Sequence, residues 1–125
     1  MQTQIKRGQI WICDLPDMGG SIQKFKRPML VVSNNLCNQH SPVIHLCPTT
    51  SRATKSKLPT HVEIGVDSGL LLPSIALVEQ SMLLSKSSLI NQVAECSEEV
   101  MQRVDHAISI QFGIVHKDKS KTQYA

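Results

Sequence analysis

The sequence has few aromatic residues and no long apolar run. Aromatic side chains make up only 3% of the 125 residues, so stacking on a flat ligand cannot be extensive. The longest uncharged apolar stretches, such as 29–32 and 70–72, are far shorter than the roughly 20 residues that a membrane span requires. The first residues, MQTQIKRGQIW, also lack the hydrophobic segment of a signal peptide. We therefore expect a cytoplasmic protein with no membrane partner.

Motifs of several common catalytic sites are also missing. The chain contains no G-x-S-x-G, P-loop, G-x-G-x-x-G or H-E-x-x-H pattern, which argues against the sites that those motifs build. Its four cysteines form no C-x-x-C pair. Two of them, Cys37 and Cys47, flank His40 and His45, but this spacing matches no established zinc pattern. We expect free thiols, no metal and no cofactor.

The chain is long enough for one domain with its own core and too short for two. Apolar or β-branched runs bounded by Gly, Pro, Asn and Ser predict strands over 9–15, 28–34, 42–48, 60–64 and 74–80. Several of these runs are apolar on both faces, as in a small closed barrel whose outside is covered. We expect one domain over 1–116 and a flexible basic tail over 117–125, which has no pattern.

One helix is predicted near the end of the chain, over 97–112. Ser97 is a good N-cap, two glutamates follow it at the positive end of the helix dipole, and Gly113 can end the helix. The apolar stripe expected to face the sheet is Val100, Val104, Ile108 and Phe112. The predicted fold class is therefore β-rich α+β, a small β-barrel with a C-terminal helix packed on the sheet.

Positive charge is unevenly distributed, although the net charge is only +3. No acidic residue occurs from Met18 to Val62, whereas the cations of that stretch are Lys24, Lys26, Arg27, Arg52, Lys55 and Lys57. If the two basic groups meet in the folded chain, they form a cationic patch that suits a polyanion. A merely solvated basic face is the alternative that charge alone leaves open.

Polar side chains gather at the ends of two predicted strands. Ser21, Gln23 and Arg27 come before one strand, and the segment 49–52, Thr-Thr-Ser-Arg, follows the next. Loops at strand ends often carry binding groups on a rigid scaffold. These two segments are therefore the first candidates for a ligand site.

Five blocks of the sequence together resemble a known family. They read IKRGQIWICDL, GSIQKFKRPMLVVSNN, PTTSRATKSKLPTHVEI, SIALVEQSMLLSKSSLI and SEEVMQRVDHAISIQFGI, in this order over residues 5–114. This pattern is similar to the MazF/PemK toxins of bacterial toxin–antitoxin systems. The resemblance implies an SH3-like β-barrel of the CcdB/PemK-like type, a homodimer, and inhibition by a cognate MazE-like antitoxin. It also implies a metal-independent, sequence-specific endoribonuclease that cuts single-stranded RNA and leaves a 2′,3′-cyclic phosphate and a 5′-hydroxyl.

The resemblance also assigns roles to individual residues. The arginine of the family's R-P block falls on Arg27 and its catalytic threonine on Thr50. An acidic position of many members is Ile22 here, so no carboxylate role is expected at that position. The residues expected to bind RNA are Ser21, Gln23, Lys24, Phe25, Thr49, Ser51, Lys57, His61 and Gln80.

Two other functional classes remain compatible with this sequence. Gyrase-poisoning toxins of the CcdB type share the implied fold and act by binding a protein, without chemistry. An SH3-like module that binds RNA passively is the second alternative. Arg27, Thr50 and the acid-free basic stretch favour RNA cleavage over both.

Overall fold

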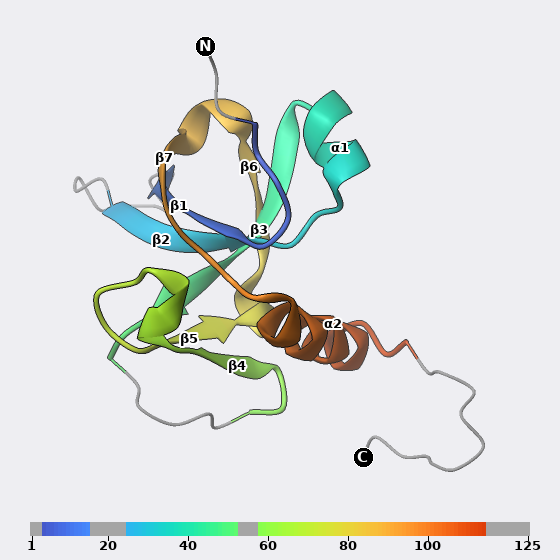
Figure 1. The fold of residues 1–125 in the computed structure, drawn as a ribbon. Helices are drawn as coiled ribbons and strands as arrows, with labels where there is room; N and C mark the ends of the chain where they lie inside the picture. The colour runs from blue at the N-terminus through green and yellow to red at the C-terminus, as the bar shows by residue number, and fades with distance from the viewer. Residues whose placement is uncertain (1–3, 16–24, 53–57, 115–125) are drawn as a thin grey trace.

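In the computed structural model, the residues described are 4–15, 25–52 and 58–114. They form seven strands, two α-helices and three short 3₁₀ helices (Figure 1). The strands are β1 (Gln9–Leu15), β2 (Phe25–Val31), β3 (Val43–Thr50), β4 (His61–Ile64), β5 (Ser74–Leu77), β6 (Met82–Ser85) and β7 (Leu89–Glu95). The helices are α1 (Asn35–His40), η1 (Val66–Ser68), η2 (Val78–Gln80), η3 (Lys86–Ser88) and α2 (Glu98–Gln111).

The strands pair antiparallel in the order β4-β5-β3-β2-β1-β7, and β6 also pairs with β3. The long strand β3 joins two parts of the sheet, because its first half pairs with β6 and its last two residues pair with β5. Among the described strands β4 and β7 do not pair, so the sheet curls like a barrel without closing. This β-rich fold with a C-terminal helix confirms the predicted fold class.

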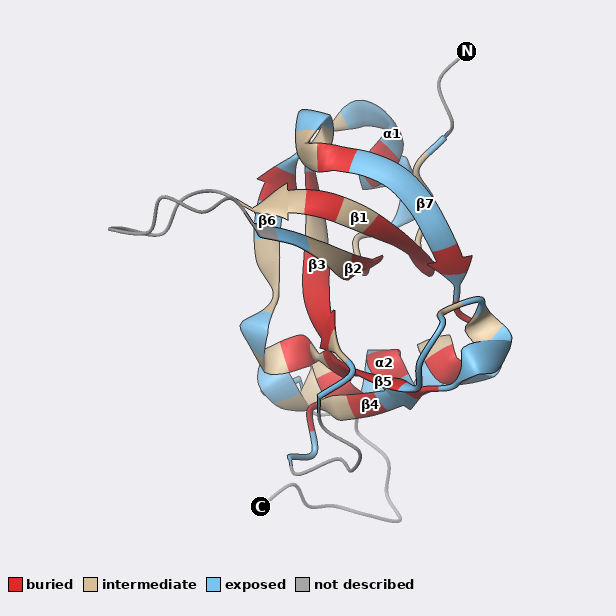
Figure 2. Ribbon diagram, turned by 90° about the vertical axis from the view of Figure 1, so that its left-hand side faces the viewer, coloured by how far each residue is buried: buried red, intermediate tan, exposed pale blue. Residues whose placement is uncertain are grey.

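Apolar side chains pack on both faces of the central strands. Figure 2 shows most of β3 as buried. On β2, Leu30 enters the cluster beneath α2, while its neighbours Met29 and Val31 enter a second cluster with Trp11. Successive side chains of a strand point to opposite faces, so a strand buried on both faces must be apolar throughout. The two clusters explain why PMLVV carries no alternation of apolar and polar residues.

Helix α2 covers the cluster that contains Leu30. Its N-cap is Ser97, whose Oγ accepts a hydrogen bond from the Val100 backbone N–H at 3.2 Å, as the sequence predicted. Gly113 follows the helix with a φ of 68°, the left-handed conformation that favours glycine. The predicted apolar stripe is wrong at its last position, because Phe112 is 58% exposed. Ala107 is buried instead, one turn from Val104.

Three of the longer elements were missed by the sequence analysis. Four of the five predicted strands have different bounds: β3 runs from Val43 to Thr50, β4 starts at His61, and the ends of β2 and β5 also differ. Helix α1 has only six residues and no apolar stripe, and its cap comes from Asn34 Oδ1, which accepts from the Cys37 N–H at 2.8 Å. Strand β7 lies at an edge and exposes four consecutive residues, so it has no period-two pattern. Strand β6 was the third omission. Strand β2 ends at Val31, and β5 ends at Leu77 and continues as η2.

Neither α-helix of the described chain has the length and apolar character needed to cross a membrane. The tail predicted over 117–125 lies outside the described residues.

Candidate active site

The start of β2 and the end of β3 lie side by side. The two strands are antiparallel, with Met29 opposite Pro48 and Leu30 opposite Cys47. Because antiparallel pairing sets the start of one strand beside the end of the other, it brings Arg27 to the Thr-Thr-Ser-Arg segment. Arg27 and the segment 49–52, which are far apart in the sequence, therefore lie close together.

Two hydrogen bonds fix this junction. The Thr49 side chain is 3% exposed, and its Oγ1 donates to the Pro28 carbonyl at 3.0 Å. Arg27 Nη2 donates to the Thr49 carbonyl at 3.2 Å. Thr49 therefore braces β2 against β3 and holds one edge of the guanidinium. The remaining N–H groups of Arg27 are the ones that can contact a ligand, because an arginine carries five donors.

These residues line a groove of about 490 Å³, which we call the arginine groove. Its lining residues are Arg27, Pro28, Thr49, Thr50, Ser51, Arg52 and Ser74. Two arginines and no carboxylate are among these described lining residues. Neither arginine forms an ion pair with an acidic residue of the described segments, where the recorded ion pairs are Arg7–Asp105 and His61–Glu79. The charge of its described lining therefore suits an anion.

Thr50 lines this groove. Its Oγ1 accepts a hydrogen bond from the Arg52 backbone N–H at 3.2 Å. A hydroxyl that accepts one hydrogen bond still has its own hydrogen to donate. Thr50 is thus oriented by the chain that follows it and can donate to an oxygen of a bound phosphate.

The structure brings Arg27, Thr49, Thr50 and Ser51 of the predicted site into one groove. Four other predicted residues, Ser21, Gln23, Lys24 and Lys57, lie outside the described residues. Phe25 begins β2, and the placement of its side chain is likewise not described. Their predicted contacts with RNA stay predictions.

His61 and Gln80 are not among the residues that line the arginine groove. His61 Nε2 lies 3.1 Å from Glu79 Oε2, and Thr60 Oγ1 donates to Glu79 Oε1 at 2.8 Å. Burial raises the pKa of Glu79, but these hydrogen bonds outweigh it and hold that pKa below its ordinary value. His61 also lines a different cavity, of about 600 Å³, between β4 and α2. Gln80 is exposed at the end of η2.

Ser74 is the groove residue that the sequence analysis missed. It begins β5, is 8% exposed, and its Oγ donates to the Leu72 carbonyl at 3.0 Å. It reaches the groove because β5 pairs with the last two residues of β3. A single serine after a proline carries no sequence signal for such a contact.

The segment with two cysteines and two histidines does not gather into a metal site. Cys47 is fully buried in the core, whereas Cys37 is exposed on α1. Among residues 4–15, 25–52 and 58–114, no three His, Cys, Asp or Glu side chains are grouped so that they could hold a metal ion.

The fold and the groove define a small β-rich protein with an arginine-lined groove at the junction of two neighbouring strands. The family model for the PemK-like, MazF-like toxins of type II toxin–antitoxin systems matches residues 6–112, so the chain belongs to that family. This confirms the family predicted from the five sequence blocks.

Similar proteins agree with this assignment. The chain is 35% identical over 112 residues to endoribonuclease EndoA of Bacillus subtilis (strain 168), covering 89% of this chain and 97% of EndoA. An endoribonuclease in complex with its cognate antitoxin, from mycobacterial species, is 25% identical, with a TM-score of 0.74 over 90% of this chain and 98% of the other. A MazE–MazF structure from Deinococcus radiodurans has a TM-score of 0.77 over 91% and 100% of the two chains, and at 23% identity it supports the fold alone.

Proposed function

We propose that this toxin is an endoribonuclease that cuts single-stranded RNA at a preferred sequence, without a metal ion, in the arginine groove. The observation that carries the proposal is a groove lined by Arg27, Thr50 and Arg52, with no carboxylate among its described lining residues. Such a groove suits a phosphate diester, and the carboxylates by which proteins usually hold Mg²⁺ are absent from its described lining. The 35% identity to an endoribonuclease supports the same reaction class.

The reaction is an attack of a ribose 2′-oxygen on the adjacent phosphorus. A bond forms between O2′ and phosphorus, the bond from phosphorus to O5′ breaks, and the products are a 2′,3′-cyclic phosphate and a 5′-hydroxyl. One proton leaves O2′ and one joins O5′, so the step needs neither an oxidant nor a net water. Negative charge grows on the non-bridging oxygens during the step, which is where donors accelerate it most.

Arg27 stabilises this charge. Its planar guanidinium can hold two phosphate oxygens at once, and its bond to the Thr49 carbonyl orients it before the substrate arrives. Pro28 restricts Arg27 to extended backbone conformations, which also keeps it at the mouth of the strand. A guanidinium offers five N–H donors and no acceptor, so we assign Arg27 to charge stabilisation rather than to proton transfer.

The deciding experiment uses a long single-stranded RNA incubated with purified protein in EDTA. We expect discrete cuts whose downstream fragments carry a 5′-hydroxyl and whose upstream fragments end in a 2′,3′-cyclic phosphate. Arg27→Ala is the control for a contaminating nuclease, because it should abolish the same bands. If the RNA stays intact in the presence of folded protein, the RNase proposal is wrong. The two remaining functions would then be binding of a protein target, as in CcdB-type toxins, and passive RNA binding.

The proposal extends to partners and location. We infer that the toxin is a homodimer in the cytoplasm. We also infer that a cognate MazE-like antitoxin inhibits it by occupying the arginine groove. The mycobacterial endoribonuclease that is 25% identical to this chain is seen in complex with its cognate antitoxin, which supports an antitoxin partner. A disordered acidic segment could mimic the phosphates and fold as it binds. Co-purification with a small acidic protein should remove the RNase activity, and an unchanged activity in a tight complex would place the antitoxin elsewhere. Sedimentation of the purified toxin tests the dimer.

A further inference from the structure

The loop between β4 and β5 exposes large apolar side chains. It carries three leucines in a row, of which Leu71 is 96% and Leu72 is 59% exposed (yellow-green segment in Figure 1). Exposed apolar side chains that occur singly need no explanation, but adjoining ones around a cavity are typical of a binding surface. The loop therefore presents an apolar surface whose ligand has to be identified.

This loop has an ordered internal structure. Ser68 Oγ donates to the Gly65 carbonyl at 2.7 Å, and the Leu70 N–H donates back to Ser68 Oγ at 3.3 Å. Gly69 has a φ of 111°, and a Cβ at that position would lie 3.4 Å from the Val93 carbonyl oxygen of β7. The loop thus approaches the edge strand closely, where only glycine fits without strain. The leucines that follow are held in position by this contact.

The leucines line a cavity of about 450 Å³, which we call the leucine cavity. This volume lies within the range of about 300–1,000 Å³ that small-molecule sites occupy. Its other apolar walls are Ile12 and Val93. Pro28, Ser51 and Ser74 line both this cavity and the arginine groove. The two spaces therefore adjoin, with a cationic side and an apolar side separated by two serines.

A single-stranded RNA has the same pattern of chemistry. Each nucleotide carries a charged phosphate and, next to it, a flat base with apolar faces and polar edges. A phosphate held by Arg27 brings its own bases to the neighbouring surface, and the serine hydroxyls at the shared wall can bond to a base edge. The charge of the arginine groove and its continuity with the leucine cavity thus favour an RNA nucleotide over an uncharged ligand.

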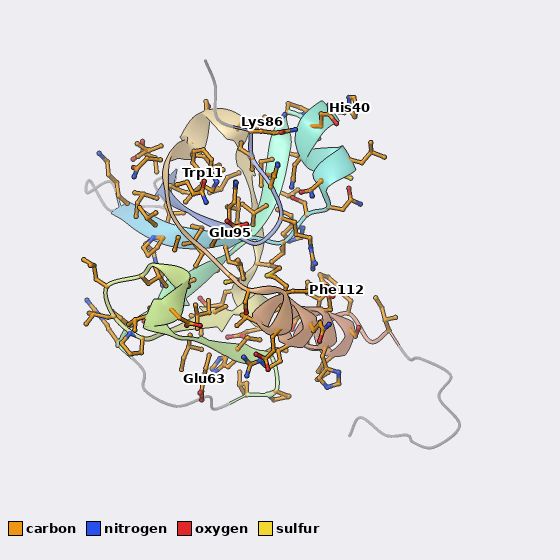
Figure 3. The ribbon with its side chains drawn as sticks, in the orientation of Figure 1. Trp11, His40, Glu63, Lys86, Glu95 and Phe112 are labelled. Carbon is orange, nitrogen blue, oxygen red and sulfur yellow. The ribbon has the colours of Figure 1, made fainter. Side chains whose placement is uncertain are left out.

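Aromatic side chains of the described residues do not offer an alternative platform for a base. Trp11 is 6% exposed and its Nε1 donates to Gln9 Oε1 at 2.9 Å, so it belongs to the core. Phe112 follows the last residue of α2 as its C-cap (Figure 3). Neither side chain is among the residues that line the groove or the cavity. An aliphatic surface is therefore what the described site offers to the face of a base.

We propose that the leucine cavity binds one unpaired nucleobase beside the scissile phosphate, and that Leu71 and Leu72 determine which base is accepted there. The inference rests on the proposed RNase function and adds a specificity subsite to it. Recognition is by shape and apolar contact, so the preference at this position is moderate and responds to the size of the wall.

The test compares Leu71→Ala and Leu72→Ala with the wild type on an RNA library that is random around the cut site. Sequencing of the 5′-hydroxyl ends gives the base preference at every position. We expect a loss of roughly tenfold in preference at one position beside the cut, with the other positions unchanged. Leu83→Ala is the matched control, because Leu83 is 61% exposed on β6 and lines neither space. All three variants should unfold at the same temperature as the wild type.

A second readout separates this inference from the proposed function. Binding of the same library with a 2′-deoxyribose at the cut position needs no cleavage, and the bound sequences should show the same loss of preference in the leucine variants. Unchanged preference in both readouts would overturn the subsite. Loss of dimerisation or of antitoxin binding with unchanged preference would also overturn it and would assign the cavity to a protein. A wild type that binds selectively without cutting would overturn the RNase proposal alone.

Discussion

Arg27 Nη2 and the carbonyl oxygen of Thr49 lie 3.2 Å apart, across the junction of β2 and β3. The bond joins a residue at the start of one strand to a residue at the end of the next, 22 positions later. Thr49 returns the support through its hydroxyl, which donates to the carbonyl of Pro28. The sheet thus fixes the position of the guanidinium. The fold, and not the ligand, therefore sets the direction of its remaining N–H donors.

The first prediction concerns Arg27. Arg27→Ala should keep the fold and lose roughly 10²–10³-fold in cleavage rate, the cost of deleting one pre-organised donor to the transition state. Arg27→Lys should also be poor, because an ammonium group cannot replace a bidentate fork. Single-turnover cleavage of a labelled RNA measures both. Arg103→Ala is the matched control, because Arg103 lines the separate cavity of about 600 Å³ between β4 and α2. Near-normal cleavage by folded Arg27→Ala would remove this residue from the mechanism.

The two neighbouring threonines should behave differently. Thr49→Val removes a buried donor and leaves the Pro28 carbonyl without that partner, so the free energy of unfolding should fall by about 1–3 kcal/mol. Thr50→Val should leave stability nearly unchanged and lower the cleavage rate, and Thr50→Ser should restore most of it. Urea unfolding and cleavage assays on the three variants separate the roles. If Thr50→Val cleaves normally, its hydroxyl only bonds to the local backbone.

A third prediction concerns acid stability. The pKa of Glu79 is lowered on folding, because bonds from Thr60 and His61 outweigh the effect of burial, which alone would raise it. A carboxylate with a lowered pKa stabilises the fold fully above its ordinary value of 4.5, and loses this contribution as the pH falls through the lowered pKa. Glu79→Gln should therefore be less stable than the wild type at about pH 7, and the difference should shrink toward about pH 3. Urea unfolding at several pH values measures the difference. A constant difference would mean that the charge of Glu79 plays no part.

The cysteines give a fourth prediction. Burial raises the pKa of the Cys13 and Cys47 thiols to about 12 and that of Cys96 to about 11, with smaller effects from neighbouring acidic groups. Cys37 is the exposed cysteine of the four. Because the thiolate is the reactive form, native protein should take up one equivalent of iodoacetamide rapidly, and Cys37→Ser should take up almost none. Mass spectrometry counts the labels. Rapid labelling of Cys47 would show that the core opens readily.

The sequence predicted those features that depend on neighbours along the chain. The bounds of β1 and the N-cap of α2 follow from a short apolar run and from one serine before two glutamates. The meeting of Arg27 with Thr50 was also predictable, because the basic and polar residues occupied the facing ends of successive strands. The family pattern then gave these residues a function.

Contacts between distant segments were not predictable from pattern alone. His61 was predicted beside the RNA cleft, yet its ring nitrogen contacts Glu79, 18 residues later, because β4 pairs with β5 in a particular register. Ser74 reaches the site because β5 pairs with β3. The leucines of the loop between β4 and β5 lie beside the site because Gly69 approaches β7 closely. Registers of this kind depend on the packing of the whole sheet.

The last prediction separates residues that hold the RNA backbone from those that read its bases. Lys26 is an exposed cation on β2, next to Arg27 in the sequence, and Arg52 is an exposed cation that lines the groove after β3. If they only neutralise phosphates, Lys26→Ala and Arg52→Ala should weaken binding about equally for every RNA sequence. Each should also reduce the salt slope of the affinity by about 0.7, the value for one phosphate contact on a single strand. The cut sites should not move.

Uncharged residues should show the opposite behaviour. Gln80→Ala, Ser21→Ala and Gln23→Ala should shift or relax the preferred bases and leave the salt slope unchanged, because these side chains can bond to base edges and carry no net charge. Duplex RNA should resist cutting by every variant, since its base edges are hidden. Mapping the cuts on one long RNA at two salt concentrations gives both quantities at once. If the two cation variants change the cleaved sequence while the uncharged variants do not, the cations read the bases, and the roles assigned here are reversed.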